Sequence, residues 1–390
     1  MTNISKYNSS RLILLLKGFF PSLLSLFLPR NKNLVILNSF HNRQFCDNTK
    51  FLFMYMINNC QNLTIKYVIN DDTLRSDLQN LYGDFFIETN SFRGMFYALS
   101  ARVWILNALE LPVGGMFLKF RRKIVLLTHG VTSKQAGLAE KNISLLKRCY
   151  YAVIRTNLTY CLTPCPEFNQ IVASHFGISE RQMLVSGFPR FDPLLRNEYT
   201  MLQKKAEISV LYAPTWRHYA DVKLFPFDDF DKDEFERFCT AKKIKFYIRV
   251  HPRFENMIPK EILSFPFVEI FSGTQFPDIN DYLPNFDMLI TDYSSIFYDF
   301  MILDRPLFFF MYDIEEYEKE IGLAVDFNKF AAGYKPKTQR EFLENISDAL
   351  EKDSFAKKRQ SIRNLACGSS KENCKDVVSL LFNKHIIMGE

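Results

Sequence analysis

The residues from Thr291 to Ser295 carry the densest set of groups in the chain that could hold a phosphate. They follow an apolar run, Met288 to Ile290, that is predicted to be a buried strand, and a helix is expected to begin near Ser295. Backbone N–H groups at the helix start and the hydroxyls of Ser294 and Ser295 would then point at one place, with the positive end of the helix dipole behind them. The turn therefore predicts an anion site. An ordinary helix N-cap is the simpler alternative, because Asp292 or Ser294 could supply it alone.

A second candidate anion site follows the predicted strand Phe246 to Val250, where a histidine lies between two arginines. Arg249, His251 and Arg253 share one face if the chain stays extended, and Pro252 favours an extended conformation at the residue before it. Two guanidinium groups beside an imidazole favour a phosphate-rich ligand over a metal ion. A strand-end histidine that hydrogen-bonds only to the backbone is the alternative.

His129 is the candidate for proton transfer. It follows the predicted strand Ile124 to Leu127, and Gly130 after it would let the turn approach a ligand closely. A histidine at the carboxyl end of a strand is well placed for general-base catalysis. The chain has six histidines, so two at strand ends in different halves favour a catalytic role over chance placement.

Two more residues lie just past predicted strands and could serve either structure or function. Arg217 ends the segment Tyr212 to Arg217, which follows the first strand of the second half of the chain. Asp47 follows the first strand of the first half, where it could cap the next helix or orient an acceptor hydroxyl. The cysteines and histidines show no zinc-binding spacing, so no metal site is predicted.

The elements that must position these residues alternate between short β-branched or aromatic runs and helical stretches, which is typical of parallel sheets covered by helices. The first series of expected strands is Leu34–Leu37, Ile65–Ile69, Val103–Leu106, Ile124–Leu127, Tyr160–Leu162 and Met183–Val185. The second series is Ile208–Tyr212, Phe246–Val250, Val268–Phe271, Met288–Ile290 and Leu307–Phe310. A Gly/Pro-punctuated linker, Gly187 to Pro193, divides them near residue 195, and the tail from Thr338 to Phe382 is expected to be helical. These patterns predict an α/β protein with two doubly wound Rossmann-type domains that face a central cleft.

The composition excludes several classes of protein. With 47% hydrophobic and 24% charged residues, the 390-residue chain is not intrinsically disordered. The 49 basic and 43 acidic residues leave a net charge of only +6, so nucleic acid is not an expected partner. The eight cysteines contain no C-x-x-C pair and are expected to be reduced thiols of a cytoplasmic protein.

The N-terminal segment is expected to lie at a membrane surface. Its apolar run from Leu12 to Leu28 contains Lys17 and Pro21, and a spanning helix needs about 20 uninterrupted apolar residues. No small-residue cleavage site follows, so a signal peptide is not predicted. Flanking cations favour an interfacial anchor, while a buried first helix is the alternative. The cluster Phe117 to Lys123 mixes phenylalanines with four cations and could contact the same membrane or an anionic acceptor, or be a solvated loop end.

Several short motifs occur in a fixed order between about Ser39 and Gly333: Ser39-Phe40-His41, Asp47-Asn48-Thr49-Lys50, His129-Gly130, Gly187-Phe188-Pro189-Arg190, Tyr212-Ala213-Pro214-Thr215-Trp216-Arg217, His251, Thr291-Asp292-Tyr293-Ser294-Ser295, Arg305-Pro306 and Tyr312-Asp313. In this order they resemble the CDP-glycerol glycerophosphotransferase family of teichoic-acid and capsule synthesis, whose members are two-domain GT-B enzymes. The resemblance therefore implies a GT-B-like fold and a phosphotransferase.

The activity implied by the resemblance is transfer of glycerol phosphate or ribitol phosphate from a CDP-polyol to a hydroxyl of a lipid-linked saccharide or growing polymer, with release of CMP. It implies that His129 is the base and that His251 and the Ser294-Ser295 turn contact the diphosphate. Further substrate contacts are expected from Thr291, Asp292, Arg217, Arg249, Arg253, Asp47 and Gly130. The CDP-polyol is the donor substrate and no cofactor is expected, while dependence on a divalent cation is left open.

With these roles the chain divides into a membrane-associating segment at 1–32, an acceptor-side α/β domain at 33–195 and a CDP-polyol-binding α/β domain with its helical tail at 196–390. The expected partners are the donor, the acceptor and a membrane surface, and the expected location is peripheral, on the cytoplasmic face of the bacterial cell membrane. The oligomeric state is left open.

The chain departs from the family pattern on the acceptor side. The family commonly continues the His-Gly pair with Thr-Pro-Leu-Lys, but here Val131, Thr132 and Ser133 precede Lys134, and Asn42 stands where glycine is common. The donor class is therefore better indicated than the acceptor, and glycerol versus ribitol phosphate stays open. Two other functions compete: a GT-B glycosyltransferase that uses a nucleotide sugar, and a non-catalytic, membrane-associated scaffold that binds nucleotide or polyanion.

Overall fold

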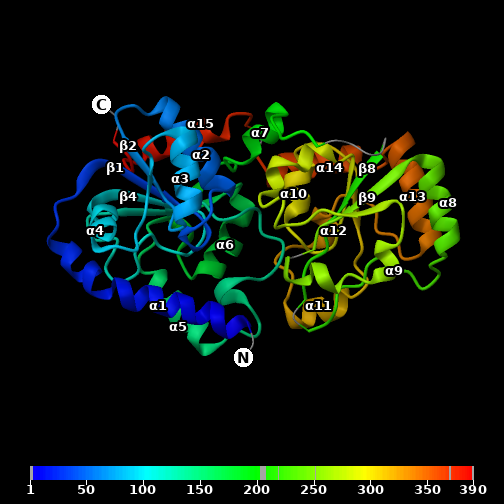
Figure 1. Ribbon diagram of the computed structural model, residues 1–390, viewed down its shortest axis with the longest axis horizontal. Coiled ribbons are helices and arrows are strands. Elements are labelled where there is room, and N and C mark those ends of the chain that lie inside the picture. The colour runs from blue at the N-terminus through cyan, green and yellow to red at the C-terminus, as the bar shows by residue number, and fades with distance from the viewer. Residues whose placement is uncertain (1–2, 203–207, 218, 251, 369, 389–390) are drawn as a thin grey trace. The chain divides into compact units, whose positions relative to one another are not determined.

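The computed structural model describes residues 3–202, 208–217, 219–250, 252–368 and 370–388, which form two compact units (Figure 1). The first unit comprises residues 1–129, 136–192 and 370–390, and the second comprises 130–135 and 193–369. Each unit therefore contains a short segment from the other part of the sequence. Residues 130–135 belong to the second unit, and residues 370–390 belong to the first. The expected division near residue 195 assigned both segments the other way.

The first unit is built on a seven-stranded parallel sheet in its described part, with the order β3-β2-β1-β4-β5-β6-β7. The strands are β1 (Asn31–Asn38), β2 (Thr64–Val68), β3 (Phe86–Ile87), β4 (Ala101–Leu106), β5 (Lys123–Leu126), β6 (Tyr160–Thr163) and β7 (Met183–Val185). Central strands such as β4 are almost entirely buried, because helices cover both faces of a parallel sheet. The strand order reverses between β1 and β4, and in such sheets ligands bind at the carboxyl ends beside this point.

The helices of the first unit are α1 (Asn3–Leu24), α2 (Asp47–Asn59), α3 (Asp72–Tyr82), α4 (Phe92–Ser100), α5 (Leu145–Ile154), α6 (Asn169–Phe176) and α15 (Asn373–Asn383). Figure 1 draws α1 beside α5, and α15 beside α2. The C-terminal helix α15 is fixed by Asp192, whose carboxylate accepts hydrogen bonds from the backbone N–H groups of Asn373 at 2.7 Å and Cys374 at 2.9 Å. This N-terminal cap explains why the last residues belong to the first unit.

The second unit is built on a five-stranded parallel sheet, again in its described part, with the order β10-β9-β8-β11-β12. The strands are β8 (Ile208–Tyr212), β9 (Ile244–Ile248), β10 (Val268–Ile270), β11 (Met288–Thr291) and β12 (Leu307–Phe309). The order reverses between β8 and β11, as in a Rossmann-type sheet. Residues that follow these two neighbouring strands therefore lie at the position where such sheets bind ligands.

The helices around the second sheet are α8 (Lys232–Lys242), α9 (Lys260–Leu263), α10 (Ile296–Met301), α11 (Ile314–Glu320), α12 (Phe327–Phe330), α13 (Gln339–Glu351) and α14 (Ala356–Ala366), while α7 (Phe191–Arg196) joins the two units in sequence. Phenylalanine dominates the core of this unit: Phe235, Phe246 and Phe342 are fully buried in one cluster. Their rings meet mostly edge to face or tilted, as Phe235 and Phe246 do at a centroid distance of 5.5 Å. The high phenylalanine content thus fills a core.

Every strand expected from the sequence exists, and the expected α/β class with two parallel sheets is confirmed. The strand β3 was not expected from the sequence; it is a two-residue edge strand that pairs with β2. The tail, expected to be one helical stretch, is divided into α13, α14 and α15. The breaks occur where Asp353 (φ 45°) and Gly368 (φ 78°) take left-handed conformations that an α-helix excludes.

Candidate functional site

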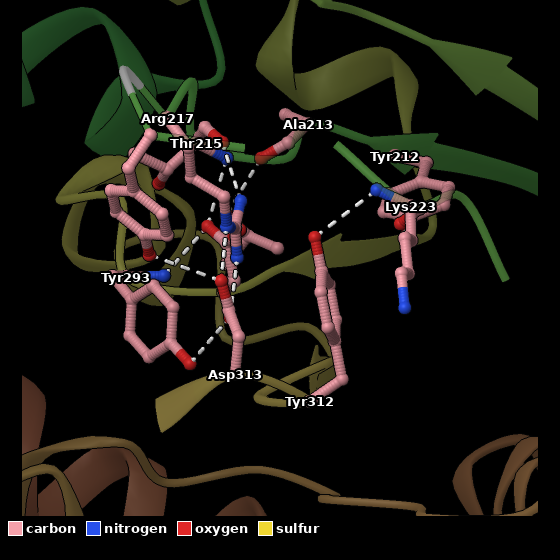
Figure 2. A network of polar contacts seen from close by, with 11 residues as sticks. Tyr212, Ala213, Thr215, Arg217, Lys223, Tyr293, Tyr312 and Asp313 are labelled. Atoms are coloured by element: carbon pink, nitrogen blue, oxygen red, sulfur yellow. Dashed lines mark hydrogen bonds and ion pairs between the residues drawn. The ribbon is translucent and has the colours of Figure 1, made fainter. Parts of the chain in front are cut away.

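The candidate site of the second unit is organised by a buried arginine. Arg217, in the loop after β8, is completely enclosed and binds two carboxylates, one from the turn after β11 and one from the loop after β12 (Figure 2). Its Nη1 donates to Asp292 Oδ2 at 2.9 Å and its Nη2 to Asp313 Oδ1 at 2.8 Å. Nε donates to the other oxygen of Asp313, so every guanidinium nitrogen has an acceptor. Arg217 therefore joins three strand-end loops and does not face solvent.

Tyrosines complete this network. Figure 2 shows the Tyr293 hydroxyl directed at Asp313, to which it donates at 3.1 Å, and Tyr219 donates to the same carboxylate at 3.1 Å. The Tyr312 ring lies 4.9 Å from the guanidinium carbon of Arg217. The face of an aromatic ring attracts a guanidinium, so the Tyr312 ring stabilises the Arg217 cation in addition to the two carboxylates.

The electrostatics of the network favour its charged state. Burial alone lowers the pKa of Arg217, but the hydrogen bonds of Asp313 and the charge of Asp292 outweigh burial and raise that pKa above its usual value. For Asp313, burial raises the pKa, but hydrogen bonds from Arg217, Tyr293 and Tyr219 lower it below its ordinary value. The Arg217–Asp313 pair therefore stays ionised at neutral pH.

The predicted anion turn lies directly against this network. Asp292 Oδ1 accepts hydrogen bonds from the backbone N–H groups of Thr215 at 2.8 Å and Tyr293 at 2.6 Å. Thr291 is fully buried, and its hydroxyl donates to the carbonyl of Ala213 at 2.7 Å. Both predicted site residues thus fix the backbone of the turn, and their polar side-chain atoms are already bonded within the unit.

Ser294 and Ser295 are the half-buried residues of the same turn. The helix begins where the sequence predicted, since Ser295 is the N-cap position of α10. The Ser295 side chain makes no capping bond, and Ser294 Oγ accepts only a long one, 3.4 Å, from the Ile296 N–H. However, α10 is only six residues long, so its dipole is short and the serines must supply most of any anion binding.

The second predicted anion site is only partly described. The backbone N–H of Arg249 donates to Tyr212 O at 2.8 Å, and its guanidinium donates to the carbonyls of Phe276 at 2.8 Å and Pro277 at 3.4 Å. Burial lowers its pKa, against the raising effect of nearby acidic groups such as Asp278. Arg249 thus supports the loop after β10. His251 and the side chain of Arg253 lie outside the described residues.

A small pocket of about 210 Å³ opens at the carboxyl ends of β8 and β9, next to the network. Its walls include Pro214, Trp216, Phe254 and Met257. Trp216 is 41% exposed, and its ring stacks on Phe254 with a centroid distance of 5.7 Å and an interplanar angle of 20°. A pocket with a flat aromatic wall is suited to a planar ring.

The segment that follows His129 in the chain belongs to the second unit and is bonded to the same turn. Ser133 is buried and donates its hydroxyl to Tyr293 O at 2.8 Å, and Gln135 N donates to Gly322 O at 2.9 Å. Gly130, a predicted substrate contact, opens this segment with φ 126°, a conformation that glycine adopts readily. The chain thus passes from His129 into the unit that carries the anion turn through a single glycine.

In the first unit, a buried ion pair holds the backbone around His129. Asp47, predicted as a site residue, begins α2 and pairs with Arg190 at 2.9 Å, with both side chains buried. Arg190 Nη1 also donates to the His129 carbonyl at 2.8 Å. Asn48 Nδ2 donates to the Thr128 carbonyl at 2.9 Å, where Thr128 has a positive φ of 62°. The carbonyls of Thr128 and His129 are therefore held by Asn48 of α2 and by Arg190.

The His129 side chain itself is exposed, and its ring lies 6.1 Å from that of Phe40 in an edge-to-face arrangement. Phe40 follows β1, and His129 follows β5, so both come from carboxyl ends of the first sheet. A fixed backbone with an exposed imidazole is an arrangement that a general base needs.

Sequence reasoning did not propose Arg190, Asn48, Ser133, Tyr293 or Asp313 as site residues. Asp313 could have been found, because it follows an expected strand just as Asp292 does. Arg190 gave no such signal, since its role depends on a contact with Asp47, far away in the sequence. Among the described residues, no group of three or more His, Cys, Asp or Glu side chains could hold a metal ion. None of the described helices is both long and apolar enough to cross a membrane.

Two Rossmann-type parallel sheets, each with polar residues gathered at the carboxyl ends of its strands, place the chain in the GT-B-type class of α/β folds. Residues 21–383 match the family described as CDP-Glycerol:Poly(glycerophosphate) glycerophosphotransferase. Because this match covers most of the chain, the chain belongs to that family, and the prediction from its motifs is confirmed. The chain is thus an enzyme of the CDP-glycerol glycerophosphotransferase class.

Individual relatives agree with the family. A teichoic acid poly(glycerol phosphate) polymerase of Bacillus spizizenii is 29% identical over 345 residues, which cover 82% of this chain and 84% of the relative. A teichoic acid glycerol-phosphate transferase of Staphylococcus aureus is 27% identical over 331 residues, 78% of this chain and 80% of the relative. The wall teichoic acid polymerase TagF, in a crystal soaked with CDPG, has a similar fold: the TM-score is 0.73 at 19% identity, over 97% of this chain and 93% of TagF.

Proposed function

We propose that this chain transfers glycerol phosphate or ribitol phosphate from a CDP-polyol to a hydroxyl of a lipid-linked saccharide or growing teichoic-acid-type polymer, and releases CMP. The observation that carries the proposal is the locked turn after β11. In a chain of this family, Arg217 and Asp292 fix the backbone at the switch point of the second sheet, and Ser294 and Ser295 are left half-buried beside it. A rigid turn with two half-buried hydroxyls suits a diphosphate, because phosphoryl transfer depends mainly on positioning and charge stabilisation.

The donor is proposed to bind the second unit. Its diphosphate contacts Ser294, Ser295 and the predicted His251 and Arg253, while the pocket beside Trp216 takes the cytosine ring. Arg217, Asp292 and Thr291 then act as positioning residues, because their polar atoms are already bonded within the unit.

The base is proposed to be His129. Its imidazole takes the proton from the acceptor hydroxyl, and the acceptor oxygen attacks the phosphorus that carries the polyol. The bond from that phosphorus to the bridging oxygen breaks, and CMP leaves with the electron pair. Asp47 and Arg190 support this step by holding the His129 carbonyl, and Gly130 lets the chain turn next to the reacting groups. General-base catalysis of this kind contributes about 10²- to 10⁴-fold in rate.

The finer partners are also part of the proposal. The acceptor is carried on a lipid, and the enzyme attaches peripherally to the cytoplasmic face of the bacterial membrane through α1 and the cluster 117–123. Supporting this, α1 exposes large apolar side chains, including Leu16 and Phe20, while its Gly18 packs against Gly114.

The test is CMP release by the purified protein given CDP-glycerol or CDP-ribitol, with and without a membrane lipid extract as the source of acceptor. UDP-sugars serve as matched donors with a different nucleotide. Acceptor-dependent CMP release is expected, and the faster donor identifies the polyol. UDP release would replace this proposal with a glycosyltransferase, and donor binding without turnover in the presence of acceptor would replace it with a scaffold.

A further inference from the structure

The first unit carries a large open groove at the edge of its sheet opposite to His129. The groove has a volume of about 1120 Å³, slightly more than the roughly 300–1,000 Å³ that is typical of ligand pockets. Lys123, the first residue of β5, and Gln182, just before β7, both line it. It therefore lies at the amino ends of these strands, whereas His129 follows the carboxyl end of β5.

The floor and sides of the groove are apolar. Phe27, Phe117 and Phe120 line it and are 86%, 55% and 51% exposed, and Leu26 and Met116 line it as well. Three exposed phenylalanines in one concave surface are unusual for a protein surface that contacts only water, and such patches mark interaction sites.

The groove also has cationic lining residues. Lys119, Arg121 and Lys123 line the same groove, and among the described residues no carboxylate lies within ion-pair distance of any of them. Burial lowers the pKa of Arg30, and the charge of Arg121 lowers it further, so the positive charges here repel one another. The groove thus combines apolar surface with uncompensated positive charge, and an anion would relieve the repulsion.

Arg122 shows that these cations are not all equivalent. It is buried, its guanidinium carbon lies 4.1 Å from the centroid of the Trp104 ring, and it donates to the carbonyls of Ala101 at 2.9 Å and Leu118 at 2.8 Å. Arg122 therefore holds the segment that carries Phe117 and Phe120 onto the sheet. Its neighbour Arg121 is exposed and makes none of these bonds.

One exposed face of α1, the helix that precedes the groove residues Leu26 and Phe27, is apolar. The exposed apolar residues of this face are spaced three or four residues apart: Ile13, Leu16, Phe20 and Leu24. Residues with this spacing lie on one face of a helix, and Phe27, in the short 3-10 turn that follows α1, lines the groove, so the apolar face leads to the groove along the chain.

We infer that the groove binds one anionic phospholipid of the membrane, with its acyl chain between the phenylalanines and its phosphate at Lys119, Arg121 and Lys123. The charge decides between occupants, because a neutral lipid or an apolar peptide would leave the cations uncompensated. The inference deepens the membrane contact proposed above and rests on it. Since the groove and His129 lie at opposite ends of β5, the bound lipid is a tether and takes no part in the transfer.

The test uses short-chain phosphatidylglycerol below its micelle concentration, so that single lipids are titrated against the full chain by calorimetry. Saturable binding is expected, and each removed cation should weaken it about fivefold. Arg121→Gln and Lys119→Gln together should therefore weaken it more than tenfold, and Phe120→Ser should do the same. Matched controls are Arg237→Gln, an exposed arginine on α8, and Leu81→Ser, an exposed apolar residue on α3, which should leave binding unchanged.

Other probes test the chosen occupant. Phosphatidylcholine of the same chain length should bind at least tenfold more weakly, and equal binding would overturn the role of the cations. Geranylgeranyl phosphate binding in place of phosphatidylglycerol would overturn the phospholipid assignment in favour of a polyprenyl carrier. Equal lipid binding by wild type and the groove variants would overturn the site itself.

Measuring CMP release beside lipid binding distinguishes a failure of the lipid site from a failure of the proposed function. CMP release with a soluble acceptor analogue should be the same in wild type, the groove variants and the controls. Lipid binding without any CMP release would contradict the proposed function and leave the groove standing, whereas normal turnover without saturable lipid binding would contradict the groove alone.

Discussion

At the scale of single residues, the stability of the second unit depends on the buried cation Arg217, which pairs with two carboxylates. We predict that Arg217→Met lowers the free energy of unfolding by about 3–5 kcal/mol, because it leaves Asp292 and Asp313 in the interior without their counter-charge. The measurement is urea unfolding followed by tryptophan fluorescence. Arg340→Met is the control: Arg340 pairs with Glu344 on an exposed helix surface, and its loss should cost no more than about 0.5 kcal/mol. Similar small effects for both variants would contradict the network described here.

A second prediction concerns the acid side of the stability curve. Burial, and then the charge of His129, lower the pKa of His175 from 6.5 to about 4. The unfolded chain therefore binds a proton at His175 more readily than the folded chain does, and stability falls as the pH drops from about 6.5 towards about 4. At pH 5 the loss is about 2 kcal/mol.

The measurement compares urea midpoints at pH 7 and pH 5 for wild type and His175→Gln, which keeps polar atoms but does not titrate in this range. The variant should lose less stability than wild type on acidification. An identical loss in both proteins would show that another group is responsible.

Residue types and spacing were sufficient to find several of these positions. Asp292 and Arg217 follow apolar strands, and the rule that ligands bind at carboxyl ends of strands selected both. What the sequence could not show is that they bind each other, because they lie on different loops and meet only once β8 and β11 pair. The sequence therefore indicated the location of the site better than the role of each residue in it.

At the scale of elements, the docking of α1 depends on a close approach of two backbones. A methyl group at Gly18 would overlap the carbonyl oxygen of Gly114, and Ser22 one turn later donates to the Phe19 carbonyl at 2.7 Å and accepts from the Met116 N–H at 3.3 Å. We predict that Gly18→Ala destabilises the docked helix by about 1–3 kcal/mol, as overpacking does elsewhere.

Limited proteolysis within α1 is the measurement, and faster cleavage is the expected result. Lys17→Ala, at the exposed neighbouring position, should leave the rate unchanged. Equal protection of both variants would mean that α1 is held by other contacts. The sequence left a surface anchor and a packed helix as alternatives for this segment, and the helix has both a packed face at Gly18 and an exposed apolar face.

At the scale of the whole chain, the alternation of strands and helices was sufficient to predict both sheets, since buried parallel strands are long apolar runs. The same alternation could not predict that residues 130–135 belong to the second unit and residues 370–390 to the first. Residues 130–135 and α15 join units that their sequence neighbours do not belong to, and only long-range bonds, such as those of Ser133 to Tyr293 and Asn373 to Asp192, decide it.

Because residues 130–135 belong to the second unit, His129 and the residues that directly follow it belong to different units. The donor is proposed to bind the second unit, the base belongs to the first, and Gly130 is the residue between His129 and the segment bonded to the anion turn. Chemistry and donor binding should therefore be separable by substitution.

The most direct test is His129→Ala, with donor affinity and CMP release measured on the same preparation. His385→Ala, at an exposed histidine near the C-terminus, is the matched control. We predict that His129→Ala binds CDP-glycerol or CDP-ribitol as wild type does but releases CMP at least about 10²-fold more slowly, while His385→Ala resembles wild type in both respects. Ser294→Ala should show the opposite pattern, with weakened donor binding. Full activity of His129→Ala would contradict the assignment of His129 as the general base.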